Sequence, residues 1–297
     1  MKNRPVRKAI FPAAGLGTRF LPVTKAQPKE MLPLVDKPTI QYGVEEAIAS
    51  GIEQVIMVTG GGKRAIVDHF DRSLELEHYL TVRGKLDLLN LLSEVDALSD
   101  QVDITYIQQK EPLGLGHAVW TARRLVEAEA CAVLLADDVI LGTAEPCLRQ
   151  LIDAHRRTGA TVLAVRRFPR SEVGRYGVIA TSRQDGRLYE VSDMVEKPEP
   201  GTEPSDLCIL GRYVLTPAVF EELENGEVGA GREIQLTDAI KRSLGTHRVV
   251  ALEFEGDYYD TGTLPGYLRA NLTLAMRRPG LREELAPLLR ELLADTP

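Results

Sequence analysis

The 297-residue sequence predicts an α/β protein with a Rossmann-like, mixed and mostly parallel central sheet flanked by helices. Short apolar runs alternate with longer segments of helical period, as in β–α–β units. The first apolar run, Lys8–Ala13, leads into a glycine-rich turn. Apolar residues make up 44% of the chain and charged residues 27%, which is the balance of an ordinary folded domain.

The first half is expected to supply the parallel strands. These are expected at Lys8–Ala13, 55–59, 104–108 and 132–136. Helices are expected at 40–50, where Gly51 suits the position after the helix end, at 63–70 and from 116 to about 128. Residues 71–100, rich in leucine and charge, are expected to form helical hairpins outside the sheet.

The second half changes in texture and predicts antiparallel additions to the sheet that carry a second ligand subsite. The strands expected there are Thr161–Arg167, 178–181, 188–195, Leu207–Leu215 and 249–254. The tail from 263 is expected to be helical, broken at 279–280, with an amphipathic leucine-rich end. We expect one domain, 1–297, with subregions 1–158, 159–262 and 263–297.

Composition excludes several classes of function. Forty-three acidic residues against thirty-six basic ones give a net charge of −7, so the protein is a poor non-specific partner for nucleic acid or anionic membranes. Three scattered cysteines and five histidines without HxxH spacing give little support to disulfides or zinc. No apolar run approaches the ~20 residues that span a membrane, and no signal peptide is evident, so we expect a cytoplasmic protein.

The most informative segment is the turn that contains Gly15 and Gly17. Glycines let a backbone approach phosphates closely, although the same pattern also occurs in plain strand-to-helix turns. Arg19, Lys25 and Lys29 follow within a few residues, and cations beside such a turn suit a triphosphate. The dinucleotide fingerprint is not met because Phe20 stands where its third glycine belongs, and the chain has no P-loop motif.

Several motifs together resemble one family. Residues 15–19 (GLGTR), 28–33 (PKEMLP) and 36–38 (DKP) are similar to the signature of the sugar-1-phosphate nucleotidylyltransferases. Within that family, residues 11–42 resemble the bacterial enzymes that act on UTP and glucose 1-phosphate. The similarity continues through 113–118, 195–198, 211–213 and 233–239, and so covers nearly the whole chain.

The resemblance implies an enzyme that makes UDP-glucose and pyrophosphate from UTP and glucose 1-phosphate with Mg²⁺. It divides the chain into a nucleotide-binding half (1–158), a sugar-phosphate-binding half (159–262) and C-terminal helices. It implies catalytic roles for Arg19, Lys29 and Lys197, and metal binding by Asp137 and Asp260. The nucleotide-binding residues it implies are Ala13, Ala14, Gly15, Gly17, Thr18, Lys25, Gln109 and Gly114. The sugar-binding residues it implies are Tyr176, Gly177, Glu196 and Gly211. Together with the amphipathic tail it suggests a homodimer or homotetramer.

Asp138 and His117 are also given expected positions. Asp137 and Asp138 end a buried strand, and neighbouring strand residues point to opposite faces, so one of them can hold a metal. We expect Asp138 to turn towards a loop or a helix terminus. His117 is expected to pack the base-binding loop at a helix start, without acting as a catalytic base.

Three alternatives remain open at this stage. A thymidylyl- or cytidylyltransferase would act on the same sugar phosphate and differ in the base that it accepts. A non-catalytic nucleotide-binding paralogue would use the same fold to modulate a partner. A nicotinamide-dependent dehydrogenase is disfavoured by the missing third glycine.

Overall fold

The computed structural model describes residues 5–142, 144–229 and 232–294. In the first half, neighbouring strands pair in parallel, in the spatial order β5 (Asp103–Gln108), β4 (Gln54–Thr59), β1 (Lys8–Ala13) and β6 (Cys131–Leu134). Ala9 in β1 pairs with both Val55 and Ala132, so β1 lies between β4 and β6. The predicted parallel strands are confirmed, with ends that differ from the prediction by two residues or fewer.

The second half extends the same sheet with mostly antiparallel strands. These follow β6 in the order β11 (Leu207–Leu215), β8 (Thr161–Arg167), β12 (Val249–Glu253), β10 (Leu188–Glu196) and β9 (Gly177–Asp185). Strand β9 also pairs with β11 through Val178 and Cys208, whereas β8 and β12 run parallel. The predicted mixed sheet with antiparallel additions is therefore confirmed.

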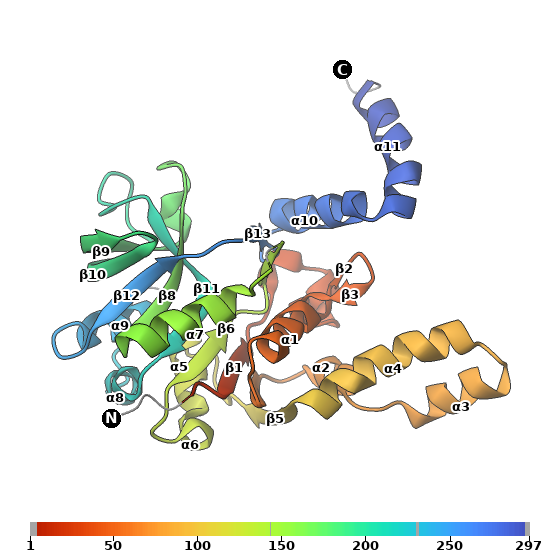
Figure 1. Cartoon of the computed structure of the whole chain (residues 1–297), viewed down its shortest axis with the longest axis horizontal. Coiled ribbons are helices and arrows are strands. Elements are labelled where there is room, and N and C mark those ends of the chain that lie inside the picture. The colour runs from red at the N-terminus through yellow and green to blue at the C-terminus, as the bar shows by residue number, and fades with distance from the viewer. Residues whose placement is uncertain (1–4, 143, 230–231, 295–297) are drawn as a thin grey trace.

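Helices cover both faces of this sheet (Figure 1). One face carries α1 (Thr39–Ala49) and α7 (Cys147–Thr158), and the other carries α5 (Leu115–Thr121), α8 (Pro217–Glu224) and α9 (Leu236–Ser243). Side chains of β1 alternate between the two cores: Phe11 packs on the α1 side and Ile10 on the α5 side. A Cβ at Gly43 of α1 would lie 2.8 Å from the Phe11 ring, so the glycine makes room for this contact.

The single helix expected at 116–128 is wrong. Helix α5 ends at Thr121, where the Ala122 N–H bonds to the Val119 carbonyl in a tighter turn, and the short α6 (Arg123–Val126) follows. Glu127, with a φ of 63°, then ends the helical path because a left-handed backbone cannot continue a right-handed helix.

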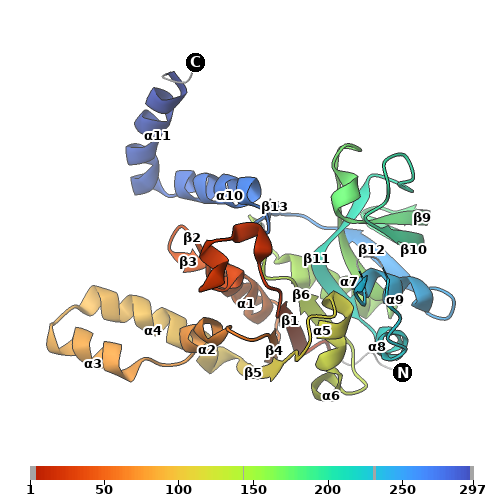
Figure 2. The same cartoon turned by 180° about the vertical axis from the view of Figure 1, so that it is seen from behind.

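Two pairs of helices extend from the body of the molecule. Helices α3 (Leu74–Val82) and α4 (Leu86–Gln101) form an arm that follows α2 (Arg64–Phe70), and α10 (Leu264–Arg277) and α11 (Pro279–Ala294) form the tail (Figures 1 and 2). The predicted hairpin and the broken tail are both confirmed. The break falls at Arg278 because a residue before proline disfavours helical backbone, while Pro279 itself suits a helix start. None of the described helices has the length and apolar character needed to cross a membrane.

Four short strands complete the structure, and the sequence analysis assigned none of them. Strand β7 (Asp138–Leu141) pairs antiparallel with β13 (Asp257–Asp260), and β2 (Pro33–Leu34) pairs with β3 (Lys37–Pro38). Because Asp260 pairs with Asp138 in this register, the ends of two distant segments meet beside β6.

A buried ion pair joins α1 to the sheet. The Arg212 guanidinium of β11 donates from Nε and Nη2 to Oε2 of Glu46 at 3.0 and 2.8 Å. Both side chains are almost fully enclosed, with exposed fractions of 1% and 6%. The second oxygen of Glu46 accepts the backbone N–H of Leu148 at the start of α7 at 2.9 Å. One carboxylate thus holds two helices and a central strand together.

We expect Glu46→Gln to lower the free energy of unfolding by about 3–5 kcal/mol, because it leaves the Arg212 charge buried without a counter-charge. Urea unfolding followed by circular dichroism measures this loss. The control is Arg64→Gln, since Arg64 and Asp68 form an exposed helical pair, 89% and 61% exposed. This control is expected to change stability by less than about 0.5 kcal/mol, and an equally small effect of Glu46→Gln would contradict the prediction.

Candidate active site

The predicted functional residues of the first half gather at one edge of the sheet. The turn that contains Gly15 and Gly17 follows β1, Gln109 follows β5 and Asp137 follows β6. These three strands run parallel, so their carboxyl ends lie together. Ligands of open α/β sheets bind at this edge.

The glycine turn packs directly on the segment that carries Lys29. Gly17 has a left-handed φ of 66°, and a Cβ there would lie 3.3 Å from Lys29 Cβ and 3.1 Å from the Thr24 methyl carbon. The Thr24 hydroxyl donates to the Gly17 carbonyl at 2.7 Å. The turn and Lys29 therefore form one surface. Ala13 ends β1, Ala14 begins the turn that follows it, and Thr18 begins the 3₁₀ turn Thr18–Phe20.

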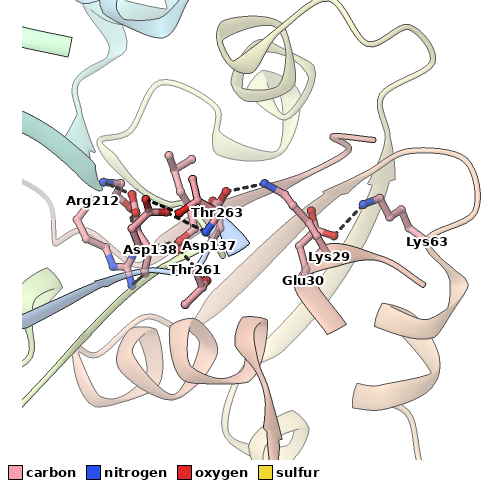
Figure 3. Close-up of polar contacts among 12 residues, drawn as sticks. Lys29, Glu30, Lys63, Asp137, Asp138, Arg212, Thr261 and Thr263 are labelled. Carbon is pink, nitrogen blue, oxygen red and sulfur yellow. Dashed lines mark hydrogen bonds and ion pairs between the residues drawn. The ribbon is translucent and has the colours of Figure 1, made fainter. Parts of the chain in front are cut away.

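Lys29 meets Asp137 across 108 positions of sequence (Figure 3). Its Nζ donates to Asp137 Oδ2 at 2.6 Å. Burial opposes the charge of each group, but their attraction prevails: it raises the pKa of Lys29 and lowers the pKa of Asp137. Arg19, which is exposed, also lowers the pKa of Asp137, so its charge lies near the same carboxylate. Lys25 is exposed too, and within the described residues no ion-pair partner faces it.

The segment of Lys29 is anchored by a second ion pair, which the sequence analysis missed. Glu30 Oε2 accepts from Nζ of Lys63 at 2.7 Å, and both side chains are buried (Figure 3). A buried Glu–Lys pair fixes the backbone on which Lys29 stands. In the sequence, Glu30 is the one acidic residue beside the cations Lys25 and Lys29, which marks it as unusual. Its partner Lys63 could not be recognised because it lies 33 positions later, after strand β4.

Asp137 and Asp260 face a common space. The N–H and hydroxyl of Thr261 both donate to the Asp137 carbonyl at 2.8 Å, which joins the end of β13 to the end of β6. A Cβ at Gly262 would lie 2.8 Å from Asp137 Oδ2 and 3.3 Å from Asp260 Oδ1, so both carboxylates approach one point.

This donor set fits Mg²⁺. The ion prefers one or two carboxylates and takes its remaining ligands from phosphates and water. Among the described residues, no cluster of three or more His, Cys, Asp or Glu side chains is arranged as an all-protein metal site.

Asp138 points away from Asp137, but the expected loop or helix terminus is wrong. Its Oδ2 accepts the backbone N–H of Gly211 at 2.8 Å, and its Oδ1 accepts the Tyr258 hydroxyl at 2.6 Å. The reason is an irregularity of β11 between Ile209 and Tyr213, which leaves the Gly211 N–H without a strand partner. Burial, and then the charge of Asp137, raise the pKa of Asp138 to about 7.

The contact between Asp138 and Gly211 explains why position 211 is a glycine. A Cβ at Gly211 would lie 2.4 Å from Asp138 Oδ2 and 2.6 Å from Leu135 Cβ, so no other residue fits there. Packing alone therefore requires Gly211, and a contact of Gly211 with a sugar remains a prediction.

The predicted base-reading residues form one loop. Gln109 donates to the Gly114 carbonyl at 3.2 Å and lies 2.8 Å from His117 Nδ1, as expected of a histidine that packs this loop. Burial lowers the pKa of His117. The carbonyl of Ile234 accepts the Gly116 N–H at 2.8 Å, and the N–H of Ile234 donates to Leu113. Segment 233–239 belongs to the family motifs but had no expected role. Through Ile234 it supports the loop that contains Gly114.

The structure also brings three of the predicted sugar residues together, Tyr176, Gly177 and Glu196. Lys197 donates its N–H to the Tyr176 carbonyl at 3.0 Å, and its φ of 45° is unusual for a lysine. Glu196 Oε2 accepts from the Thr237 hydroxyl at 2.8 Å and lies 3.1 Å from where a Cβ of Gly177 would stand. Arg175, which no sequence motif marked, donates from Nη2 to Asp260 Oδ2 at 2.8 Å.

The chain is similar to known proteins over nearly its whole length. Residues 8–277 match the family described as "Nucleotidyl transferase". The chain is 53% identical to a UTP–glucose-1-phosphate uridylyltransferase of Bacillus subtilis over 290 residues, 98% of each chain. It is 50% identical to the enzyme of that name from Staphylococcus epidermidis, over 97% of this chain and 99% of the relative.

Solved structures give the same result. A UDP-glucose pyrophosphorylase complexed with UDP-glucose matches with a TM-score of 0.85 and 40% identity, covering 92% of this chain and all of the other. A UTP-bound UGPase from Acinetobacter baumannii matches with a TM-score of 0.88 and 38% identity, covering 97% and 99%.

The Lys29–Asp137 pair predicts a pH-dependent loss of stability in Lys29→Met. Because the folded-state pKa of Asp137 is lowered, its contribution is present near neutral pH and is lost as the pH falls through that pKa. The variant is expected to be less stable than wild type by about 1–3 kcal/mol near pH 7, and the difference should shrink below about pH 4. Urea unfolding across this range tests it, with Lys25→Met as the control, and a difference that stays constant with pH would refute it.

Proposed function

The chain belongs to the nucleotidyl transferase family, and we propose that it transfers a uridylyl group from UTP to glucose 1-phosphate, giving UDP-glucose and pyrophosphate. The observation that carries the proposal is the meeting of Lys29, Asp137 and Asp260 beside the glycine turn. Relatives with 50–53% identity over nearly the full length carry the name of this activity. The thymidylyl and non-catalytic alternatives are not favoured.

The chemistry needs charge control and alignment. An oxygen of the sugar phosphate is already anionic, so it attacks the α-phosphorus of UTP without a general base. A bond forms from this oxygen to the α-phosphorus, and the bond from the α-phosphorus to the oxygen shared with the β-phosphorus breaks in line. The protein must therefore reduce the repulsion between two polyanions and hold them in the right geometry.

Each cation of the site acts on a different phosphate group. Arg19 and the N–H groups of the glycine turn bind the departing pyrophosphate. Lys29 lies at the α-phosphate, and Lys197 holds the incoming phosphate. Lys25, exposed beside the turn, adds to the charge that attracts the triphosphate.

The remaining residues choose the base and the sugar. Gln109 and the Gly114 backbone pair with the uracil edge, which offers two carbonyls around one N–H. Glu196 accepts from sugar hydroxyls, while Tyr176, Gly177 and Gly211 border the hexose.

Asp137 and Asp260 would hold the divalent ion, which we propose is Mg²⁺. When bound, the ion neutralises charge on the phosphates of the two substrates. In the protein itself Lys29 and Arg175 balance these carboxylates.

We further propose a cytoplasmic homodimer or homotetramer. All three cysteines are buried free thiols, as is usual in a reducing compartment. Helix α11 has no buried residue, and its Leu288 and Leu293 are exposed, so this apolar surface could be covered by a second copy.

A pyrophosphate-release assay tests the function directly. With glucose 1-phosphate and Mg²⁺, we expect UTP to react faster than dTTP and CTP. The preference over dTTP should be the smaller one, because a single methyl group contributes only about 1–3 kcal/mol to discrimination. Release that is as fast with dTTP or CTP as with UTP would contradict the assignment of the base.

Lys197→Ala should lower turnover by about 10²–10³-fold, since it removes a cation that contacts the reacting phosphate. Lys197 is half exposed, so the fold should be unaffected. The matched control is Lys85→Ala, which removes an exposed lysine at the turn between α3 and α4. Steady-state kinetics measure both variants, and near-normal turnover of Lys197→Ala would remove this assignment.

A further inference from the structure

Arg175 is a cation of the site that the mechanism above leaves without a role towards substrate. It ends the short 3₁₀ turn Val173–Arg175, directly before Tyr176. Its Nη2 donates to Asp260 Oδ2 at 2.8 Å. Because Asp260 is one of the two carboxylates proposed for the metal, Arg175 neutralises a charge that would otherwise attract a divalent ion.

The other contacts of Asp260 show which bond can be exchanged. Its Oδ1 accepts the Gly262 N–H at 2.9 Å, and its Oδ2 also accepts the Thr263 hydroxyl at 3.2 Å. These two local bonds orient the carboxylate. Among the described residues, Arg175 is the one cation in ion-pair contact with it, so the arginine supplies its counter-charge.

The guanidinium is held on the sugar side of the site. It lies 5.7 Å from the centre of the Tyr176 ring, which stacks on Phe168 at 4.8 Å. The carbonyl of Tyr176 accepts the N–H of Lys197, so Arg175 and Lys197 enter the site from adjacent segments. The Arg175 side chain is 51% exposed and can therefore change partner without disturbing the core.

Two ligands compete for the same charges at this point. A divalent ion would be attracted to the same Asp260 carboxylate that now pairs with the guanidinium. The planar fork of arginine also matches a phosphate, to which it can donate two parallel hydrogen bonds. An arginine displaced from Asp260, beside Lys197, meets the phosphate that Lys197 is proposed to hold.

We propose that Arg175 exchanges its counter-ion during binding. It pairs with Asp260 in the metal-free protein, and it binds the phosphate of glucose 1-phosphate once a divalent ion takes the carboxylate. This inference rests on the proposed function, because it needs both the metal site and the sugar phosphate.

The exchange couples the two ligands. The metal must displace the guanidinium, which weakens metal binding when no sugar phosphate is present. Glucose 1-phosphate stabilises the displaced guanidinium and so strengthens metal binding, and by reciprocity the metal strengthens binding of the sugar phosphate.

Direct binding of Mn²⁺, followed by its electron paramagnetic resonance signal, tests the competition on the whole enzyme without nucleotide. Arg175→Gln should bind Mn²⁺ about three- to tenfold more tightly than wild type, as expected from loss of one half-exposed ion pair. Arg175→Lys keeps the charge and should stay near wild type. Arg170→Gln is the matched control, because Arg170 is an exposed arginine nearby that pairs with Glu203.

Steady-state kinetics, and the effect of glucose 1-phosphate on Mn²⁺ binding, test whether Arg175 binds the sugar phosphate. Arg175→Gln should raise the KM for glucose 1-phosphate about tenfold and leave the KM for UTP nearly unchanged. Glucose 1-phosphate should tighten Mn²⁺ binding to wild type more than to this variant.

The outcomes separate this inference from its premise. Wild-type Mn²⁺ affinity in Arg175→Gln, or an unchanged KM for glucose 1-phosphate, would overturn the exchange. Asp260→Asn should bind Mn²⁺ weakly whatever Arg175 does. If Asp260→Asn keeps wild-type affinity, the metal site itself is wrong and the inference fails with it.

Discussion

The site depends on how the Arg212 guanidinium holds the turn between β6 and β7. Besides its two bonds to Glu46, it donates to the Leu135 carbonyl at 3.1 Å and to the Asp138 carbonyl at 2.8 Å. These two carbonyls flank Asp137 on either side. A planar group with five N–H donors can satisfy several acceptors at fixed angles, which a lysine cannot do. The position of the proposed metal ligand is therefore set by a charge buried in the core and balanced from α1.

Asp138 completes this constraint from the other side. With its backbone carbonyl on Arg212 and its carboxylate on the Gly211 N–H and the Tyr258 hydroxyl, it has no freedom to turn towards Asp137. Its neighbour is thereby left facing Lys29 and the space beside Gly262. Two adjacent carboxylates thus have different roles: one is fixed by the sheet, and the other is available to ligands.

Features of the fold that depend on short-range sequence patterns could be predicted from the sequence. The glycine turn and the strands around β1 follow from short-range spacing, and strand alternation indicates that only one of Asp137 and Asp138 can face a metal. The choice of Asp137 came from the family resemblance. Helix α9 could also have been found, since its buried Leu236, Ala239 and Ile240 repeat at helical spacing. The partners of Arg212 and Arg175 could not be predicted, because they lie 166 and 85 positions away. The contact of Arg212 requires β11 to insert between β6 and β8, an order that the chain does not follow.

The ion pairs of the site resolve the difficulty of an acidic protein that must bind two polyanions. Lys29 lies on Asp137 and Arg175 on Asp260, so in the protein alone each of these carboxylates is paired with a cation. In the proposed exchange, a divalent ion at Asp260 would free Arg175 for a phosphate, so that the carboxylate would keep a counter-charge. A cluster of unpaired cations would attract phosphate equally well, but its mutual repulsion would destabilise the fold. Pairing them with the proposed metal ligands avoids that repulsion in a chain whose net charge is −7.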